Sequence, residues 1–201
     1  MVITELSPVG KGKKRLAIDE ESLGYLYYGD IRRMHLEEGM EVSLALRDEI
    51  MEKLYLRAKE RALYLVSKNR KTQGQLVLKL KEGGYHSSTI SKVLNFMKEY
   101  GFIDDRQYIL DFYEYKKDRY SSYQIKKKLL EKRIDKNLIA QVLEEQKKND
   151  SYVLQGLIEK FSRGKDLKDS KEKRRIISKL VYRGFSYGDI SQALGKVVER
   201  Y

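Results

Sequence analysis

Apolar residues recur along most of the chain at the three- and four-residue spacing of amphipathic helices. Leu46, Ile50, Leu54 and Ala58 follow a four-residue step, which keeps their side chains on one helical face. The chain has a single proline, at position 8, so proline breaks no helix beyond that point. The pattern therefore predicts a mainly helical protein from residue 46 onward.

The first 45 residues follow a different pattern, with short β-like runs separated by turn-forming residues. These runs are Val2–Leu6, Arg15–Ile18 and Leu23–Tyr28. A helix is expected near Tyr28–Leu36. Because a lone hairpin is only marginally stable in water, we predict that residues 1–45 form a small β-rich appendage that packs on a neighbouring part of the chain.

A block of 19 residues recurs three times without a gap, at residues 76–94, 125–143 and 176–194. Five apolar columns stay in register over the three copies, which is the signature of an internal repeat. The columns are Leu80, Leu129 and Leu180; Tyr85, Ile134 and Phe185; Ile90, Ile139 and Ile190; Val93, Val142 and Ala193; and Leu94, Leu143 and Leu194.

Each block is typical of a helix, a short turn and a second helix. Gly84 and Gly184 suit helix C-termini, and Ser87 or Ser88, Asp135 and Ser186 offer N-cap oxygens to the helix that follows. A further helix precedes each block, at Lys59–Ser67, Arg106–Lys117 and Tyr152–Phe161. Each repeat therefore has three helices.

The fold class predicted is mainly α, with three tandem three-helix repeats in an elongated array and the small N-terminal β-rich appendage. We expect a connecting helix and repeat 1 at residues 46–103, repeat 2 at 104–149 and repeat 3 at 150–201. Repeats this small bury little apolar surface alone, so neighbouring repeats are expected to support one another.

Charge is distributed unevenly along the chain. Lys and Arg number 42 against 30 Asp and Glu, a net charge of +12. Residues 1–57 carry nine basic and eleven acidic groups, so the positive charge belongs to the repeats. The candidate nucleic-acid- or filament-binding residues are Lys68, Arg70, Lys71, Lys79, Lys126, Lys127, Lys128, Lys132, Arg133, Lys171, Lys173, Arg174, Arg175, Lys179 and Arg183.

Two interpretations of these basic runs stand side by side. They form a stripe that faces phosphates, or they are solvated helix faces with excess lysine. Like charges four residues apart, as at Arg175 and Lys179, slightly destabilise a helix. Their presence in three similar places favours a polyanionic partner.

Several kinds of chemistry have no basis in the sequence. The chain has no cysteine and only two widely separated histidines, His35 and His86, so we predict no metal site. A P-loop motif is absent, and Asp104 and Asp105 are best explained as helix-capping residues. We therefore predict no catalytic residue, no cofactor and no enzymatic activity. Without a signal peptide or an 18-residue apolar run, a cytoplasmic protein is expected.

The motifs resemble the RecX family, bacterial regulators of the RecA recombinase, over nearly the whole chain. The likeness is strongest in Ala62–Leu63, in Gln75–Leu76 with Leu80 and Gly84–Tyr85, and in Tyr100–Tyr108, and it continues through repeat 2. Ser122 and Arg133 stand where small, glycine-like residues are usual, which leaves the turn geometry of repeat 2 open. Repeat 3 is looser and has a basic linker at 164–173.

The resemblance implies tandem three-helix repeats that lodge in the helical groove of the RecA–DNA filament. Such proteins modulate RecA ATP hydrolysis, strand exchange and coprotease activity, usually by inhibition, in homologous recombination and the SOS response. The partners implied are the RecA filament and, weakly and without sequence preference, single- and double-stranded DNA. A monomer without membrane association is expected.

Two alternatives remain open at this point. The helix–turn–helix of each repeat could bind DNA directly, with Thr89, Ser91 and Lys92 of repeat 1 reaching base edges and affinity depending on sequence. A structural adaptor whose concave face binds an acidic protein is the other alternative, and competition by DNA or polyphosphate would argue against it.

Overall fold

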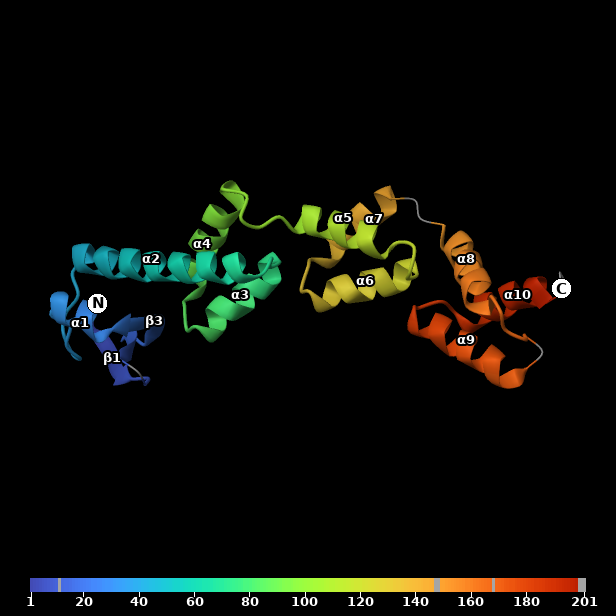
Figure 1. Cartoon of the computed structure of the whole chain (residues 1–201). Coiled ribbons are helices and arrows are strands. Elements are labelled where there is room, and N and C mark those ends of the chain that lie inside the picture. Colours follow the sequence, from blue (N-terminus) through green and yellow to red (C-terminus); the bar gives the residue numbers. More distant parts are fainter. Residues whose placement is uncertain (11, 147–148, 168, 199–201) are drawn as a thin grey trace. The chain divides into compact units, whose positions relative to one another are not determined.

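The structure, a computed structural model, describes residues 1–10, 12–146, 149–167 and 169–198 (Figure 1). Three strands, β1 (Ile3–Pro8), β2 (Lys13–Ile18) and β3 (Glu21–Tyr27), precede a succession of helices. The chain divides into two compact units, Met1–Asp104 and Asp105–Tyr201. The predicted fold class, mainly helical with a small N-terminal sheet and three-helix repeats, is confirmed.

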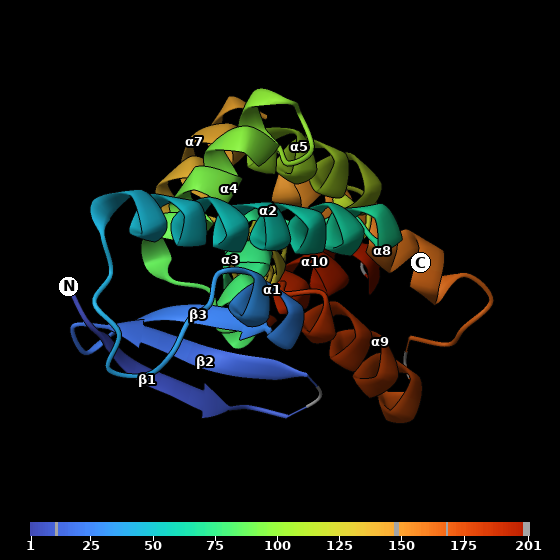
Figure 2. The same ribbon diagram turned by 90° about the vertical axis from the view of Figure 1, so that its left-hand side faces the viewer.

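The N-terminal sheet is antiparallel with strand order β1-β2-β3. One of its faces buries Leu6, Leu16 and Leu26, which share an apolar core with Ile50 and Leu54 of α2 (Leu44–Lys68). Figure 2 shows the sheet lying below α2, with α1 (Tyr28–Arg33) beside it. The appendage thus obtains from α2 the apolar cover that a small sheet lacks by itself.

α2 is a single helix of 25 residues, whereas the sequence pattern predicts a connecting helix and then a separate helix at Lys59–Ser67. It begins at Leu44, so the predicted boundary after residue 45 falls inside it. No proline or glycine interrupts residues 44–68. Its first half packs on the sheet, and Ala58 and Ala62 pack in the core of repeat 1.

Each repeat has an apolar core of its own. α2 packs with α3 (Gln73–Glu82) and α4 (Ser87–Glu99) around a core that includes Leu76, Leu80, Val93 and Met97. The core of α5 (Asp105–Lys116), α6 (Ser122–Glu131) and α7 (Lys136–Glu145) includes Ile109, Ile125, Leu129 and Ile139. That of α8 (Asp150–Ser162), α9 (Ser170–Tyr182) and α10 (Tyr187–Val198) includes Ile158, Ile176, Leu180 and Ile190.

The turn between the second and third helices has a left-handed residue at the same place in all three repeats. Gly84 has φ +76°, Arg133 +60° and Gly184 +87°. In repeat 1 the Gly84 N–H donates to the Lys81 carbonyl at 2.9 Å and the Tyr85 N–H to the Leu80 carbonyl at 3.2 Å, the Schellman pattern of helix C-termini. Arg133 therefore adopts the conformation of its glycine counterparts and leaves the turn unchanged.

The caps that begin the third helix of each repeat are partly as predicted. Asp135 accepts hydrogen bonds from the N–H groups of Asn137 and Leu138, and Ser186 accepts one from Asp189. In repeat 1 the predicted cap, Ser87 or Ser88, is wrong. α4 begins at Ser87, so His86 takes the N-cap position and its Nδ1 accepts from the Ser88 N–H at 3.3 Å.

Candidate functional site

The predicted basic residues of repeat 1 lie at the junction of α2 and α3 and along α3. Lys68 ends α2, with its Nζ 5.5 Å from the centre of the Tyr64 ring. Arg70 and Lys71 lie in the connection that follows. Lys79 makes an ion pair with Glu82 at 2.7 Å. Part of this positive charge is therefore already balanced within the repeat.

In repeat 2 the basic run lies on α6 and its C-terminal turn. Lys127 is exposed, whereas Lys126 and Lys128 are half-buried, and the Lys128 Nζ lies 5.3 Å from the centre of the Tyr120 ring. Lys132 is the C-cap of α6, and Arg133 is the left-handed residue that follows. Lys127 lies opposite the buried Ile125 and Leu129 on the helix, because two residues correspond to a rotation of about 200°.

The basic run of repeat 3 occupies α9. Lys171, Lys173 and Arg174 lie exposed in its first turns. Arg175 is also exposed, and it pairs with Glu172 at 2.5 Å while Lys165 pairs with the same carboxylate at 3.0 Å. Hydrogen bonds from Lys165 and Arg175 lower the pKa of Glu172, so its carboxylate stays charged at a lower pH than that of an ordinary glutamate.

Lys179 of α9 and Arg183, the C-cap of that helix, are turned toward an aromatic side chain of α8. The Lys179 Nζ lies 5.5 Å and the Arg183 guanidinium 4.9 Å from the centre of the Phe161 ring. Arg183 also donates to the Lys179 carbonyl at 2.9 Å. These two cations have a structural part in repeat 3. The predicted basic residues thus form no single uniform stripe, and their binding role stays a prediction.

The outward faces of α6 and α9 combine basic and exposed apolar side chains. On α6, Tyr123, Lys127 and Leu130 stand at i, i+4 and i+7, and Tyr123 and Leu130 are 68% and 41% exposed. On α9, Arg174 and Val181 share one face, and Val181 is 48% exposed. We call Tyr123, Lys127, Leu130, Arg174, Val181 and Tyr182 the α6/α9 surface.

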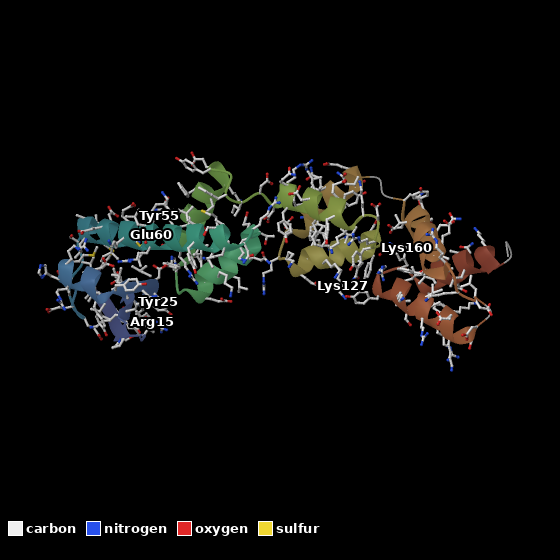
Figure 3. All side chains as sticks on the ribbon, viewed as in Figure 1. Arg15, Tyr25, Tyr55, Glu60, Lys127 and Lys160 are labelled. Carbon is white, nitrogen blue, oxygen red and sulfur yellow. The ribbon has the colours of Figure 1, made fainter. Side chains whose placement is uncertain are left out.

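The two parts of the α6/α9 surface meet at a hollow. Tyr123 and Val181 both line this hollow, which has a volume of about 490 Å³ and also includes Phe185 and Asp189. Figure 3 shows Lys127 on α6. Contiguous exposed apolar side chains of this kind mark interaction sites on soluble proteins.

Hydrogen bonds at the start of α6 fix repeats 2 and 3 against each other. The Ser121 hydroxyl donates to the Gly184 carbonyl at 2.8 Å, and the Ser121 N–H donates to the Arg183 carbonyl at 3.0 Å. The Ser122 N–H and hydroxyl donate to the Asp150 carboxylate at 2.9–3.0 Å. Gly184 is required, because a Cβ there would lie 2.6 Å from the Ser121 Oγ.

Sequence reasoning missed the apolar members of the α6/α9 surface. It also missed the joint between repeats 2 and 3, by which we mean the hydrogen bonds of Ser121 and Ser122 to repeat 3. The sequence does contain a signal for this surface. Leu130 and Val181 occupy the same position in the 19-residue blocks of repeats 2 and 3, and both are apolar and exposed. Ser122, noted only as a departure from the usual pattern, is a contact of the joint. The joint had no such signal, since its partners lie 28 to 63 residues apart.

The helix–turn–helix alternative meets an obstacle in repeat 1. The Thr89 side chain is 1% exposed, so it cannot contact a base edge, and the Ser91 hydroxyl donates to the Ser87 carbonyl of its own helix at 3.0 Å. Asp105 lies in the first turn of α5, which fits the helix-capping interpretation.

Within the described part of the chain, no cluster of three or more His, Cys, Asp or Glu residues is arranged to hold a metal ion. None of the helices there is long and apolar enough to cross a membrane.

Comparisons with known proteins bear on the same repeats. Residues 153–194 match a family model described as RecX, third three-helix domain. The chain is 29% identical over 169 residues to regulatory protein RecX of Clostridium acetobutylicum, covering 81% of this chain and 79% of that protein. It is 32% identical over 185 residues to that of Lactococcus lactis subsp. cremoris, covering 88% of this chain and 68% of that protein.

A solved structure has the same fold. A crystal structure of regulatory protein RecX superposes with a TM-score of 0.56 and 18% sequence identity, covering 96% of this chain and 98% of that one. The fold of this chain is therefore shared with a known protein.

Proposed function

Because the chain belongs to the RecX family, we propose that it binds the RecA–DNA filament in its helical groove and inhibits RecA ATP hydrolysis, strand exchange and coprotease activity. It does so in the cytoplasm as a monomeric, non-enzymatic regulator. It inhibits because it binds a less active state of the RecA filament more tightly than the active state.

The observation that supports this proposal most is the mixed character of the α6/α9 surface. Phosphates alone would be met by Lys and Arg, whereas Tyr123, Leu130 and Val181 are exposed beside Lys127 and Arg174. Aromatic and apolar groups next to arginine are typical of the energetic centres of protein–protein interfaces. This composition favours a partner that offers both protein and nucleic acid.

The distribution of charge supports a nucleoprotein partner as well. Residues 58–201 carry 33 basic and 19 acidic groups, so the repeats are strongly cationic while residues 1–57 are not. A field of this sign raises the rate of encounter with a DNA-containing filament and makes binding dependent on salt. Tyr123 and Leu130 then supply contacts that salt does not screen.

The test is RecA ATP hydrolysis on single-stranded DNA with increasing amounts of the chain. We expect the natural chain to lower the rate at stoichiometric amounts. In the double variant Lys127→Glu with Arg174→Glu, half-inhibition should need at least about ten times more protein, which corresponds to about 1.4 kcal/mol of binding free energy.

A matched control is Lys136→Glu with Lys196→Glu, which makes the same change of charge on exposed residues of α7 and α10. It should inhibit like the natural chain. A natural chain that alters neither the ATPase rate nor the filament would contradict the proposed function. Equal inhibition by both double variants would instead remove the α6/α9 surface from the contact.

A further inference from the structure

A basic and aromatic patch lies on the outer face of the N-terminal sheet, in a segment whose net charge is negative. Lys13 and Arg15 of β2 and Tyr25 and Tyr27 of β3 form it, and Arg57 of α2 extends it. We call these five residues the sheet patch. None of them belongs to the repeats' basic runs.

Strand register brings the four sheet residues together on one face. Lys13 stands opposite Tyr27 and Arg15 opposite Tyr25, so two basic–aromatic pairs lie side by side, about 7 Å apart along the strands. The intervening residues, Lys14 and Leu26, point the other way. Figure 3 shows the Arg15 and Tyr25 side chains next to each other on this part of the sheet.

The cations lie over the rings. The Lys13 Nζ is 4.9 Å and the Arg57 guanidinium 4.3 Å from the centre of the Tyr27 ring, and the Arg15 guanidinium is 5.9 Å from that of Tyr25. Tyr27 is 37% exposed. At the same end of the sheet, the Lys14 Nζ lies 5.9 Å from the centre of the Tyr28 ring.

Packing holds the patch in position from below. Arg57 is fixed by the buried carboxylate of Asp30, to which it donates at 2.8 and 3.2 Å. The Tyr25 ring packs on Gly84, where a Cβ would lie 2.0 Å from it. Two groups of the patch are therefore ordered before any ligand arrives, which lowers the entropic cost of binding.

Acidic residues of this segment are separated from the patch. Asp19, Glu20 and Glu21 cluster around the β2–β3 turn, at the opposite end of the strands from Lys13 and Tyr27. The exceptions are Glu5, 4.0 Å from Arg15, and Asp30, which pairs with Arg57 at 2.8 Å. Counting charge by segment hides this separation, because the two groups cancel in the sum.

We propose that the sheet patch binds single-stranded nucleic acid, with phosphates at Lys13 and Arg15 and a base stacked on Tyr27, whose ring Arg57 holds in place. Stacking of a base on an aromatic ring contributes about 1–3 kcal/mol. Two cations now lie over this ring, Lys13 and Arg57, and each such contact contributes about 0.5–1 kcal/mol at an exposed site. A base can therefore displace the Lys13 side chain from the ring, and the displaced ammonium group remains near the phosphates.

Single strands fit this patch better than other polyanions. A duplex hides its base faces and would use the cations alone, and an acidic peptide would leave the Tyr27 ring without a stacking partner. The proposal concerns nucleic acid bound by the chain itself, so it does not depend on the proposed action on the RecA filament.

The experiment measures binding of a fluorescent oligothymidylate by anisotropy, using the full chain without RecA, at several salt concentrations. Tyr27→Leu should weaken binding about tenfold, whereas Tyr27→Phe, which keeps the ring, should bind like the natural chain. Lys13→Gln with Arg15→Gln should reduce the slope of log affinity against log salt by about 1.4, because each phosphate of a single strand that a cation neutralises adds about 0.7 to that slope.

A matched control is Lys98→Gln with Lys136→Gln, which removes two exposed charges outside the sheet patch and should leave the slope unchanged. Circular dichroism melting of every variant measures folding. Equal affinity of Tyr27→Leu and the natural chain, or equal slopes for the two lysine-containing double variants, would overturn the proposal. So would a polyglutamate competitor that binds as tightly and depends on Tyr27 to the same degree.

Discussion

Arg133 holds a left-handed conformation that glycine holds in the other two repeats. Its φ is +60°, and this conformation costs a residue with a Cβ about 1–2 kcal/mol. The turn keeps the residue nonetheless, because the apolar contacts of the two flanking helices set the path of the chain. Sequence comparison among the repeats could locate this position. It could not predict whether the turn would change its conformation or the arginine would adopt a left-handed one.

We predict that Arg133→Gly increases the free energy of unfolding. Relief of the left-handed strain outweighs the greater flexibility that glycine gives the unfolded chain, so the gain should be up to about 1 kcal/mol. Urea denaturation measures it. Arg133→Ala, which keeps a Cβ at the same φ, is the control and should show no comparable gain; a stabilisation equal to that of glycine would show that the arginine side chain, rather than the backbone, is the source.

Asp30 is a buried carboxylate enclosed by basic side chains. Its side chain is 2% exposed, and it pairs with Arg57 at 2.8 Å and Lys53 at 3.3 Å. Burial by itself would raise the pKa of Asp30, but hydrogen bonds and charge from Arg57 and Lys53 outweigh burial and lower that pKa below 3.8. The folded state therefore binds this proton less readily than the unfolded chain does.

The contribution of Asp30 to the free energy of unfolding should be fully present above about pH 4, the ordinary pKa of an unfolded aspartate. It should be lost as the pH falls through the lower pKa of Asp30 in the folded state. We predict that Asp30→Asn reduces the free energy of unfolding at pH 7 by about 1–3 kcal/mol and weakens its decrease in acid. Urea denaturation from about pH 7 to about pH 2.5 tests this across the window in which the carboxylate is protonated. Parallel curves for the two proteins would contradict the lowered pKa.

At the scale of elements, the repeats were predictable and their joints were not. Columns such as Leu80, Leu129 and Leu180 mark buried helix faces because a helix must hide one apolar stripe, and all three are buried. The described contacts between repeats 2 and 3 include hydrogen bonds of Ser121 and Ser122. Serines carry no periodic pattern, so sequence alone could not assign their partners.

α2 joins two cores that the sequence pattern treats as separate. Ile50 and Leu54 pack with the sheet, while Ala58 and Ala62 pack with α3 and α4. Because the buried residues of α2 are spaced by four along one uninterrupted helix, the same helix can contribute side chains to both cores. The position of the sheet against repeat 1 thus depends on the helical phase of α2.

We predict that inserting one alanine between Leu56 and Arg57 destabilises the Met1–Asp104 unit by at least about 2 kcal/mol. The insertion rotates one half of α2 by about 100° relative to the other half. Residues that are now buried would then be exposed. Urea denaturation followed by circular dichroism is the measurement. One alanine inserted between the exposed Glu37 and Glu38 is the control and should change stability little. Equal effects of the two insertions would show that the sheet and repeat 1 do not rely on a common helix.

For the whole molecule, the sequence could predict the fold class and the family, because both depend on repeated apolar columns. It could predict where positive charge is dense, but it could not predict which cations remain available for a partner. Lys179 and Arg183 lie over the Phe161 ring, and Arg175 pairs with Glu172. Such contacts depend on how side chains of neighbouring helices lie relative to one another. The spacing of charges along one helix does not predict this.

Electron cryomicroscopy of RecA filaments on single-stranded DNA, saturated with this chain, would show where the protein binds and which of its faces meets the filament. We expect periodic density in the groove of the filament, fitted by the three-helix repeats, with Lys127 of α6 and Arg174 of α9 against the filament. Filaments whose grooves stay empty while the chain binds elsewhere would refute binding in the groove, and an orientation that turns α6 and α9 toward solvent would refute the role of the α6/α9 surface.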